Sequence, residues 1–222
     1  MIFYAGDIHG RALAVEGIDA KARKAGAKIV VQVGDFGIHF LGPKKHCPIA
    51  EYFHRRESGP TWYTCGGNHD NWPHWNSLPS VKGQTELAKG CYYVHRGEGI
   101  TLDGVKHLFF GGAESVDRLR RVEGLDWWPE ETPSTAEFRK FFDEVEAFKP
   151  EVVVTHDAPL QIEIWKYNRN KSPTPKNLDN AFRLCEHKPD YWMFGHHHLV
   201  DDWVIGNTVF YCCGIEGDYV AL

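Results

Sequence analysis

Short apolar runs alternate with longer mixed stretches in the first part of the chain, a pattern typical of parallel strands joined by helices. Residues 2–5 and 28–33 are two such runs, and the second is rich in β-branched side chains, which predicts a buried strand. Residues 11–25 have helical composition and precede Gly26, a residue that commonly terminates a helix. The alternation predicts a parallel sheet built from βαβ units.

Beyond residue 91 the expected strands are more closely spaced and form hairpins. Asp103-Gly104 and Gly206-Asn207 are two-residue turn signals between apolar runs, so each predicts an antiparallel hairpin. Residues 166–176 are polar and basic with two prolines, and they predict a loop that overhangs the strand end at His156. The remaining strands are predicted at 61–65, 91–94, 99–102, 105–110, 151–155, 191–194, 201–205 and 208–212, and the remaining helices at 50–57, 135–148 and 177–186.

Groups that can bind metal follow five of the predicted strands. The segments are Asp7-Ile8-His9, Gly34-Asp35, Gly66-Gly67-Asn68-His69-Asp70, His156-Asp157 and Gly195-His196-His197-His198. Each segment alone is an ordinary turn or surface cluster, but all five occupy the same kind of position. The carboxyl ends of parallel strands meet at one crevice, so these side chains should converge. Carboxylate, imidazole and amide groups suit Mn, Fe, Zn, Ni or Co, and Asp35 is the natural bridge between two ions about 3.5–4 Å apart.

Together these motifs resemble those of the calcineurin-like metallophosphoesterase superfamily. They follow one another in the same order as in that superfamily and span almost the whole chain. The resemblance implies an α/β fold of four layers, an α-β-β-α sandwich of two mixed β-sheets flanked by helices, with residues 1–222 as one domain. It implies two divalent ions as cofactors, with Mn expected and Fe, Zn, Ni, Co or Mg as alternatives. One ion would be bound by Asp7, His9, Asp35 and His198. The other would be bound by Asp35, Asn68, His156 and His196.

The resemblance also implies the chemistry, which is the hydrolysis of a small phosphate ester. A hydroxide that bridges the two ions would attack phosphorus, while Asn68 contacts the substrate and helps to neutralise the developing charge. His69 corresponds to the histidine beside the leaving group and would assist the leaving oxygen. Asp35 and His69 are therefore the predicted catalytic residues, and His197 is not a ligand in this scheme.

One departure from the superfamily bears on the substrate. Protein phosphatases of the superfamily follow their Gly-Asp with an Asp-Arg-Gly triplet, whereas this chain continues with Phe36-Gly37-Ile38. The missing arginine argues against a protein phosphatase, and residues 111–118 look like the small bacterial and phage-type branch. We expect a phosphodiesterase with broad substrate tolerance. The alternatives are a phosphomonoesterase, with phosphoprotein as one candidate substrate, or a catalytically degenerate scaffold that kept the fold for partner binding.

Several residues outside the ligand set have both a functional and a structural interpretation. Arg118 and Arg121 form a basic cluster with Arg120, and either could bind phosphate through its forked guanidinium group. The alternative is a solvated charged turn. The same choice, between a role in the site and a role in packing or turns, applies to Trp127, Trp128, Asp70 and Asp157.

Composition narrows the remaining possibilities. The 222 residues carry a formal net charge of -5, and such an acidic chain is poorly suited to sequence-independent binding of nucleic acid. The six cysteines include no C-x-x-C pair, and Cys65 and Cys212 lie in apolar runs, as buried thiols do. The sequence shows neither a signal peptide nor an apolar stretch that could span a membrane. We therefore expect a cytoplasmic enzyme with reduced cysteines and no membrane partner.

Overall fold

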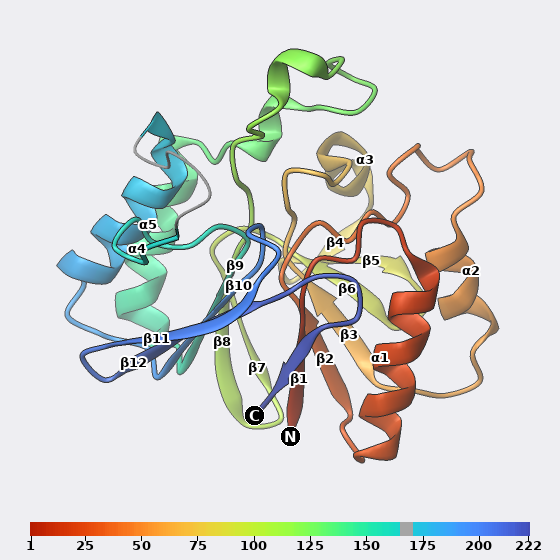
Figure 1. Ribbon diagram of the computed structural model, residues 1–222, viewed down its shortest axis with the longest axis horizontal. Helices are drawn as coiled ribbons and strands as arrows, with labels where there is room; N and C mark the ends of the chain where they lie inside the picture. The colour runs from red at the N-terminus through yellow and green to blue at the C-terminus, as the bar shows by residue number, and fades with distance from the viewer. Residues whose placement is uncertain (165–170) are drawn as a thin grey trace.

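Two mixed β-sheets face each other and carry helices on their outer faces, as Figure 1 shows for the computed structural model, which describes residues 1–164 and 171–222. The first sheet contains, in spatial order, β13 (Tyr219–Ala221), β1 (Ile2–Ala5), β2 (Ile29–Gln32), β3 (Thr61–Thr64), β6 (Cys91–Val94), β5 (Gln84–Ala88) and β4 (Ser80–Val81). The second contains β11 (Val200–Ile205), β12 (Thr208–Cys213), β10 (Tyr191–Phe194), β9 (Val152–Thr155), β8 (Val105–Phe110) and β7 (Glu98–Leu102). The four-layer sandwich is confirmed.

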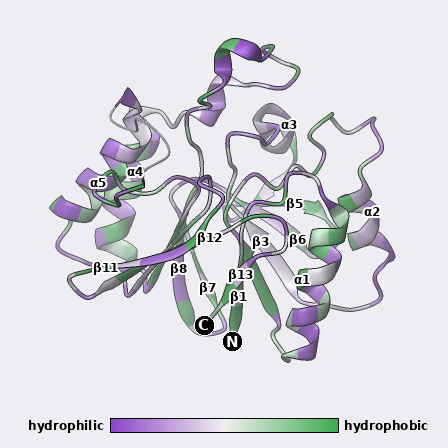
Figure 2. Ribbon diagram, in the orientation of Figure 1, coloured by the Kyte–Doolittle hydropathy of each residue, from purple (hydrophilic) through white to green (hydrophobic). Residues whose placement is uncertain are grey.

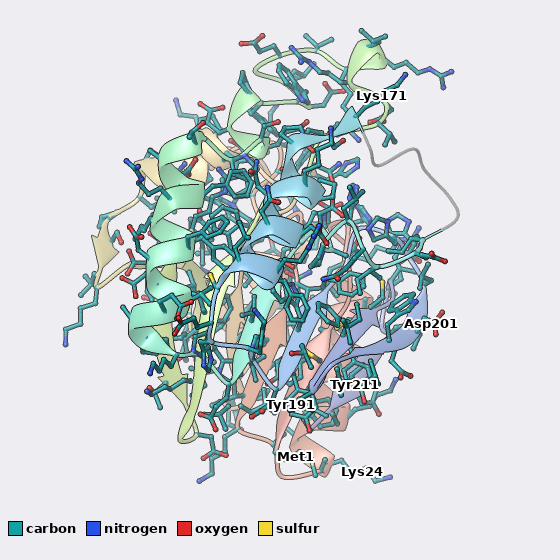
Figure 3. The ribbon with its side chains drawn as sticks, turned by 90° about the vertical axis from the view of Figure 1, so that its left-hand side faces the viewer. Met1, Lys24, Lys171, Tyr191, Asp201 and Tyr211 are labelled. Atoms are coloured by element: carbon teal, nitrogen blue, oxygen red, sulfur yellow. The ribbon has the colours of Figure 1, made fainter. Side chains whose placement is uncertain are left out.

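The helices divide between the two outer faces. The first sheet carries α1 (Ala12–Lys24), α2 (Pro48–Arg55) and α3 (Trp72–Ser77), and the second carries α4 (Thr135–Phe148) and α5 (Pro173–Leu184). Figure 3 looks onto α4 and α5, with side chains filling the space between the helices and the second sheet. Gly26 has a left-handed backbone and closes α1, because the Ala27 amide donates to the Ala22 carbonyl. The expected role of Gly26 is confirmed.

Alternation of side chains along each strand builds three apolar layers. On β1, Phe3 packs toward the helices, whereas Tyr4 packs toward the opposite sheet. On β10, Trp192 and Phe194 face α4 and α5, and Met193 faces the first sheet. Strands buried on both sides need apolar residues at successive positions, which explains the unbroken apolar runs of the sequence. In Figure 2, β1 has the green of hydrophobic residues, whereas the helices carry purple, hydrophilic stretches.

Most predicted elements are confirmed within two residues, including both hairpins, which pair antiparallel as β7 with β8 and β11 with β12. One boundary prediction is wrong. The helix expected to begin at residue 177 begins at Pro173, because proline is tolerated in a first helical turn, where its missing amide donor has no partner to lose. Residues 173–176, predicted as loop, are therefore helical. The overhang expected of residues 166–170 lies outside the described residues.

The sequence patterns did not predict α3, β4, β5 and β13, nor the 3₁₀ helices η1 (Arg118–Arg120) and η2 (Pro129–Glu131). All six cysteines are free, and Cys65 and Cys212 are buried, as expected. Among the residues that the structure describes, no helix is both long enough and apolar enough to cross a membrane.

Candidate metal centre

The candidate ligands meet where five parallel strands end, at the top of the sandwich in Figure 1. The buried side chain of Gln32 ties two of these exits together, because it donates to the Gly6 carbonyl (3.1 Å) and accepts from the Gly34 amide (3.0 Å). Two glycines also leave space for the ligand side chains. A Cβ atom on Gly195 would lie 2.1 Å from Asp7 Oδ1, and one on Gly67 would lie 2.1 Å from Asp35 Oδ1. Glycine at these exits leaves room for the two carboxylates.

The first predicted ligand set is brought together as one cluster. Donor atoms of Asp7, His9, Asp35 and His198 all lie within 4.8 Å of one another. His9 Nε2 is 3.0 Å from His198 Nε2, which is itself 3.2 Å from Asp7 Oδ2. Two buried carboxylates facing two imidazoles cost folding energy unless a cation or proton is shared among them. Within residues 1–164 and 171–222, only this set of carboxylate, imidazole or thiol donors converges so closely, and its chemistry fits a divalent metal ion.

The second predicted set gathers on the other side of Asp35. Asp35 Oδ1 lies 3.3 Å from His156 Nε2, and the same nitrogen lies 3.1 Å from Asn68 Oδ1. The ring of His196 is next to that of His156, with 5.0 Å between their centroids. The donors of this second set do not form a cluster as tight as that of the first set.

Hydrogen bonds from the backbone orient these side chains. The His156 Nδ1–H group donates to the Val33 carbonyl at 2.8 Å, which leaves Nε2 directed at Asp35 and Asn68. The His196 amide donates to both Asp7 oxygens at 3.1 Å, and the His69 amide donates to Asp35 Oδ1 at 2.6 Å. Main-chain amides at the strand exits therefore hold the carboxylates in place. The other lone pairs of the carboxylate oxygens stay free to bind a cation.

The ionisation of the centre also suits a cation. Burial alone would raise the pKa of Asp35, but the histidines around it, His156 foremost, outweigh burial and hold that pKa below its usual range. Burial disfavours a charged His156, yet the facing Asp35 carboxylate raises its pKa well above the ordinary value. A divalent ion would replace the proton that this pair shares. Burial lowers the pKa of His196 to about 3, so its imidazole is neutral and keeps a free lone pair.

The basic cluster separates into residues with different surroundings. The Arg121 side chain is only 7% exposed, and its Nη2 lies 2.6 Å from His69 Nε2 at the rim of the centre. Burial, and in part the Arg121 charge, lowers the pKa of His69. Arg118 instead places its guanidinium 4.2 Å from the centroid of the Trp127 ring, and Arg120 is exposed.

The remaining candidates stabilise turns and packing. Asp70 is buried and accepts from the amides of Gly37 and Gly67, both at 2.8 Å, so it joins the loops that follow β2 and β3. Asp157 Oδ1 lies 3.0 Å from Nε2 of His197, the histidine that was not expected to be a ligand. Trp128 is buried and meets the ring of Phe40 edge-on at 5.4 Å.

Comparison with known proteins identifies the family. The sequence model of the calcineurin-like phosphoesterases matches residues 2–200, which include every proposed ligand. The chain belongs to the calcineurin-like phosphoesterase family. Membership supports hydrolysis of phosphate esters, the reaction that the motifs implied. No curated protein sequence matches the chain significantly.

Solved structures share the fold of this phosphoesterase at low sequence identity. Protein TT1561 of Thermus thermophilus is 14% identical with a TM-score of 0.59, over 97% of this chain and 89% of that one. GAP50, the anchor in the inner membrane complex of Plasmodium, is 12% identical with a TM-score of 0.58, over 96% and 71%. A proposed 5′-nucleotidase from Staphylococcus aureus is 13% identical with a TM-score of 0.53, over 97% of this chain and 48% of that one.

One group of residues that reaches the centre of the phosphoesterase was not predicted from sequence patterns. Ser115 Oγ accepts from Asn68 Nδ2 at 3.2 Å and donates to Glu131 Oε2 at 2.6 Å. The Ser115 amide donates to the other oxygen of Glu131 at 2.7 Å. Glu131 is 2% exposed, an unusual location for a carboxylate in a stretch that looks like a polar turn. Two residues far from Asn68 in the sequence, Ser115 and Glu131, thereby orient its amide.

Proposed function

We propose that this protein is a dinuclear-metal-dependent phosphodiesterase. The position of Asp35 carries the proposal. Its Oδ2 lies 3.8 Å from His9 Nε2 in the first set, and its Oδ1 lies 3.3 Å from His156 Nε2 in the second. A buried carboxylate that faces two sets of donors supports the role of a bridging ligand that we assign to it. Two divalent ions, for which we favour Mn, would supply Lewis-acid activation of water and offset charge on the phosphoryl group.

Each residue of the proposed centre then has a role. We assign the first ion to Asp7, His9, Asp35 and His198, and the second to Asp35, Asn68, His156 and His196. The Asn68 amide and the Arg121 guanidinium would hold phosphoryl oxygens, since both donate hydrogen bonds toward an anion. His69, at the rim beside Asn68, would supply a hydrogen bond or a proton to the leaving oxygen.

The turn after β2 favours a diester over a monoester. Phe36 is fully buried and Gly37 has no side chain, so this turn directs no guanidinium at the substrate. A phosphodiester carries one negative charge where a monoester carries nearly two, and it therefore needs fewer cationic groups beyond the ions. Arg121 beside His69 is the observation that favours the monoester as a second candidate.

A scaffold without catalysis is the non-enzymatic alternative, and GAP50, with the same fold, is an anchor. Partner binding does not require buried carboxylates. Asp7 and Asp35 are 0% and 1% exposed, and their donor atoms converge with those of two histidines. Such an arrangement is costly to fold unless it binds something positive, which supports the enzyme.

Metal removal tests the proposal. After exhaustive chelation, bis(p-nitrophenyl) phosphate should no longer be hydrolysed, and Mn²⁺ should restore both two bound ions per chain and activity. kcat/KM should be higher for this diester than for p-nitrophenyl phosphate, and the reverse order would favour the monoesterase. Full activity in a sample shown by elemental analysis to be metal-free would reject the proposal.

Two substitutions locate the bridge. Asp35→Asn should lose both ions, because in our assignment Asp35 would bind both and carries charge. Asn68→Ala should lose only the second, because its neutral oxygen contacts one. Elemental analysis after dialysis separates the two variants, and two ions retained in Asp35→Asn would show that Asp35 is not the bridge.

A further inference from the structure

A pocket of about 270 Å³ opens beside the metal centre, with His9 and His69 forming the wall that the two share. The loop between β2 and α2 supplies most of its other walls, including Phe40 and Leu41, and Pro48 at the start of α2 adds another. We propose that this pocket binds the leaving group of the phosphate ester, and that this group is an aromatic ring system with a hydrogen-bond donor and no positive charge. The inference rests on the proposed function and names its substrate class.

The pocket lies on the side of the centre from which the alcohol would depart. His69, which we place beside the leaving oxygen, lines it together with His9, and the two rings meet edge-on with 5.1 Å between centroids. A phosphoryl group at the centre would therefore direct its substituent on the His69 side into this pocket.

Long-range hydrogen bonds hold the loop in place before any ligand binds. The Asn71 side chain donates to the Phe40 carbonyl at 2.9 Å, and the Trp75 indole donates to the Ile38 carbonyl at 3.1 Å. Trp128 contacts the Phe40 ring from the segment on the opposite side. Because the wall is preformed, little of the ligand's binding energy is needed to order the loop.

The lining indicates the chemistry of the ligand. Phe40, Leu41 and Pro48 provide apolar contacts, and Phe40 can stack or meet a ring edge-on. A cavity of about 150 Å³ is enough for benzene, so this pocket has room for a bicyclic ring. None of its described lining residues is a carboxylate, while Lys45 carries positive charge, so a cationic group would be repelled.

His39 supplies a polar contact for the ring. Its Nε2–H group donates to the Leu87 carbonyl at 3.2 Å, which leaves Nδ1 with a lone pair. Among the described residues this buried nitrogen has no hydrogen-bond partner. Burial lowers the pKa of His39, which keeps the ring neutral and Nδ1 an acceptor. His39 lines the pocket, and a small turn of its ring would bring Nδ1 to an N–H or O–H group on the bound ring, which would satisfy it.

Three methyl phosphodiesters with similarly basic leaving groups test the inference. The leaving alcohols are 6-amino-2-naphthylmethanol, 2-naphthylmethanol and cyclohexylmethanol, and released alcohol is measured by chromatography. The Mn²⁺-loaded protein should rank them in that order by kcat/KM. Phe40→Ala should reduce the preference for naphthylmethyl over cyclohexylmethyl about tenfold, mainly through KM, because aromatic contacts bind ground and transition states alike. Equal rates on all three esters would overturn the inference.

A matched variant and a binding measurement complete the test. Leu13, on α1 and outside the pocket, is 82% exposed, so Leu13→Ala should keep the wild-type preference. Binding of free 6-amino-2-naphthylmethanol, followed by its fluorescence, should weaken about tenfold in Phe40→Ala. If no ester is hydrolysed, the proposed function fails and this titration alone decides the pocket. Identical binding by wild type and Phe40→Ala would reject it.

Discussion

At the scale of single residues, Arg118 and Arg121 offer a comparison within one segment. Arg121 is nearly buried and contacts His69, whereas Arg118 stacks on Trp127. Arg121→Ala should therefore lower kcat/KM about tenfold, the value of one charge-assisted contact to phosphate, while both ions stay bound. Arg118→Ala should have a much smaller effect on kcat/KM. Steady-state kinetics with elemental analysis measures both, and equal effects would remove Arg121 from the proposed phosphate contacts.

His69 is the second residue whose role can be measured. His69→Asn should keep both ions, because His69 is not a proposed ligand, and should lower kcat by about 10²–10⁴ if the imidazole protonates the leaving oxygen. The loss should be small for a nitrophenolate, which leaves without protonation, and large for an alkoxide. Rates on esters of p-nitrophenol and of a simple alcohol separate the cases. Equal losses on both would leave His69 with only an electrostatic role.

At the scale of elements, the segment between β8 and α4 orients a proposed ligand without supplying one itself. Glu131 holds the Ser115 hydroxyl proton, so Ser115 can only accept from Asn68, and the Asn68 oxygen must point toward His156. Ser115→Ala frees the amide to rotate and should weaken binding of the second ion about tenfold, in the range known for residues that orient ligands. Metal titration should show the first ion unaffected.

Two further variants make this prediction specific. Ser115→Thr keeps the hydroxyl and should restore affinity for the second ion. Ser77→Ala removes an exposed hydroxyl on α3 that bonds only the His74 carbonyl among the described residues, so it should change neither affinity. Unchanged binding of both ions in Ser115→Ala would mean that the Asn68 amide is oriented without this chain of hydrogen bonds.

The same elements show what sequence patterns can predict. Long apolar runs and turn signals such as Asp103-Gly104 located the central strands and hairpins, because burial on both faces and positive φ angles restrict residue choice. Helix α3 has six residues, fewer than two turns, so its apolar residues cannot show a helical repeat, and β5 has no apolar run. The strand-end motifs located the proposed ligands. Ser115 and Glu131 lie in two polar stretches between β8 and α4, and only their tertiary contacts reveal their proximity to Asn68.

At the scale of the whole molecule, both sheets contribute to the centre. Asp7, Asp35 and Asn68 follow strands of the first sheet, whereas His156, His196 and His198 follow strands of the second. The site therefore depends on how the two sheets pack against each other. Away from the centre, the buried contact between Tyr4 and His107 also joins the sheets. Tyr4 OH lies 2.8 Å from His107 Nε2, and His107 Nδ1–H donates to the Val105 carbonyl at 2.9 Å.

This contact makes stability depend on pH. Burial lowers the pKa of His107 to about 4, and Tyr4 requires the neutral ring as an acceptor. The unfolded chain, with a histidine pKa of about 6.5, binds the proton more readily. Stability from this residue is therefore complete above pH 6.5 and is lost as pH falls toward 4. The loss between pH 7 and pH 5 should be about 2 kcal/mol.

His107→Gln tests the effect, because glutamine keeps a donor and an acceptor but does not titrate in this range. Urea unfolding of the chelated proteins at pH 7 and pH 5 gives the free energy of unfolding of each, free of any contribution from bound metal. The wild type should lose about 2 kcal/mol more than His107→Gln on acidification, since all other titrating groups are common to both. Equal losses would mean that His107 accepts its proton without disturbing the contact between the sheets.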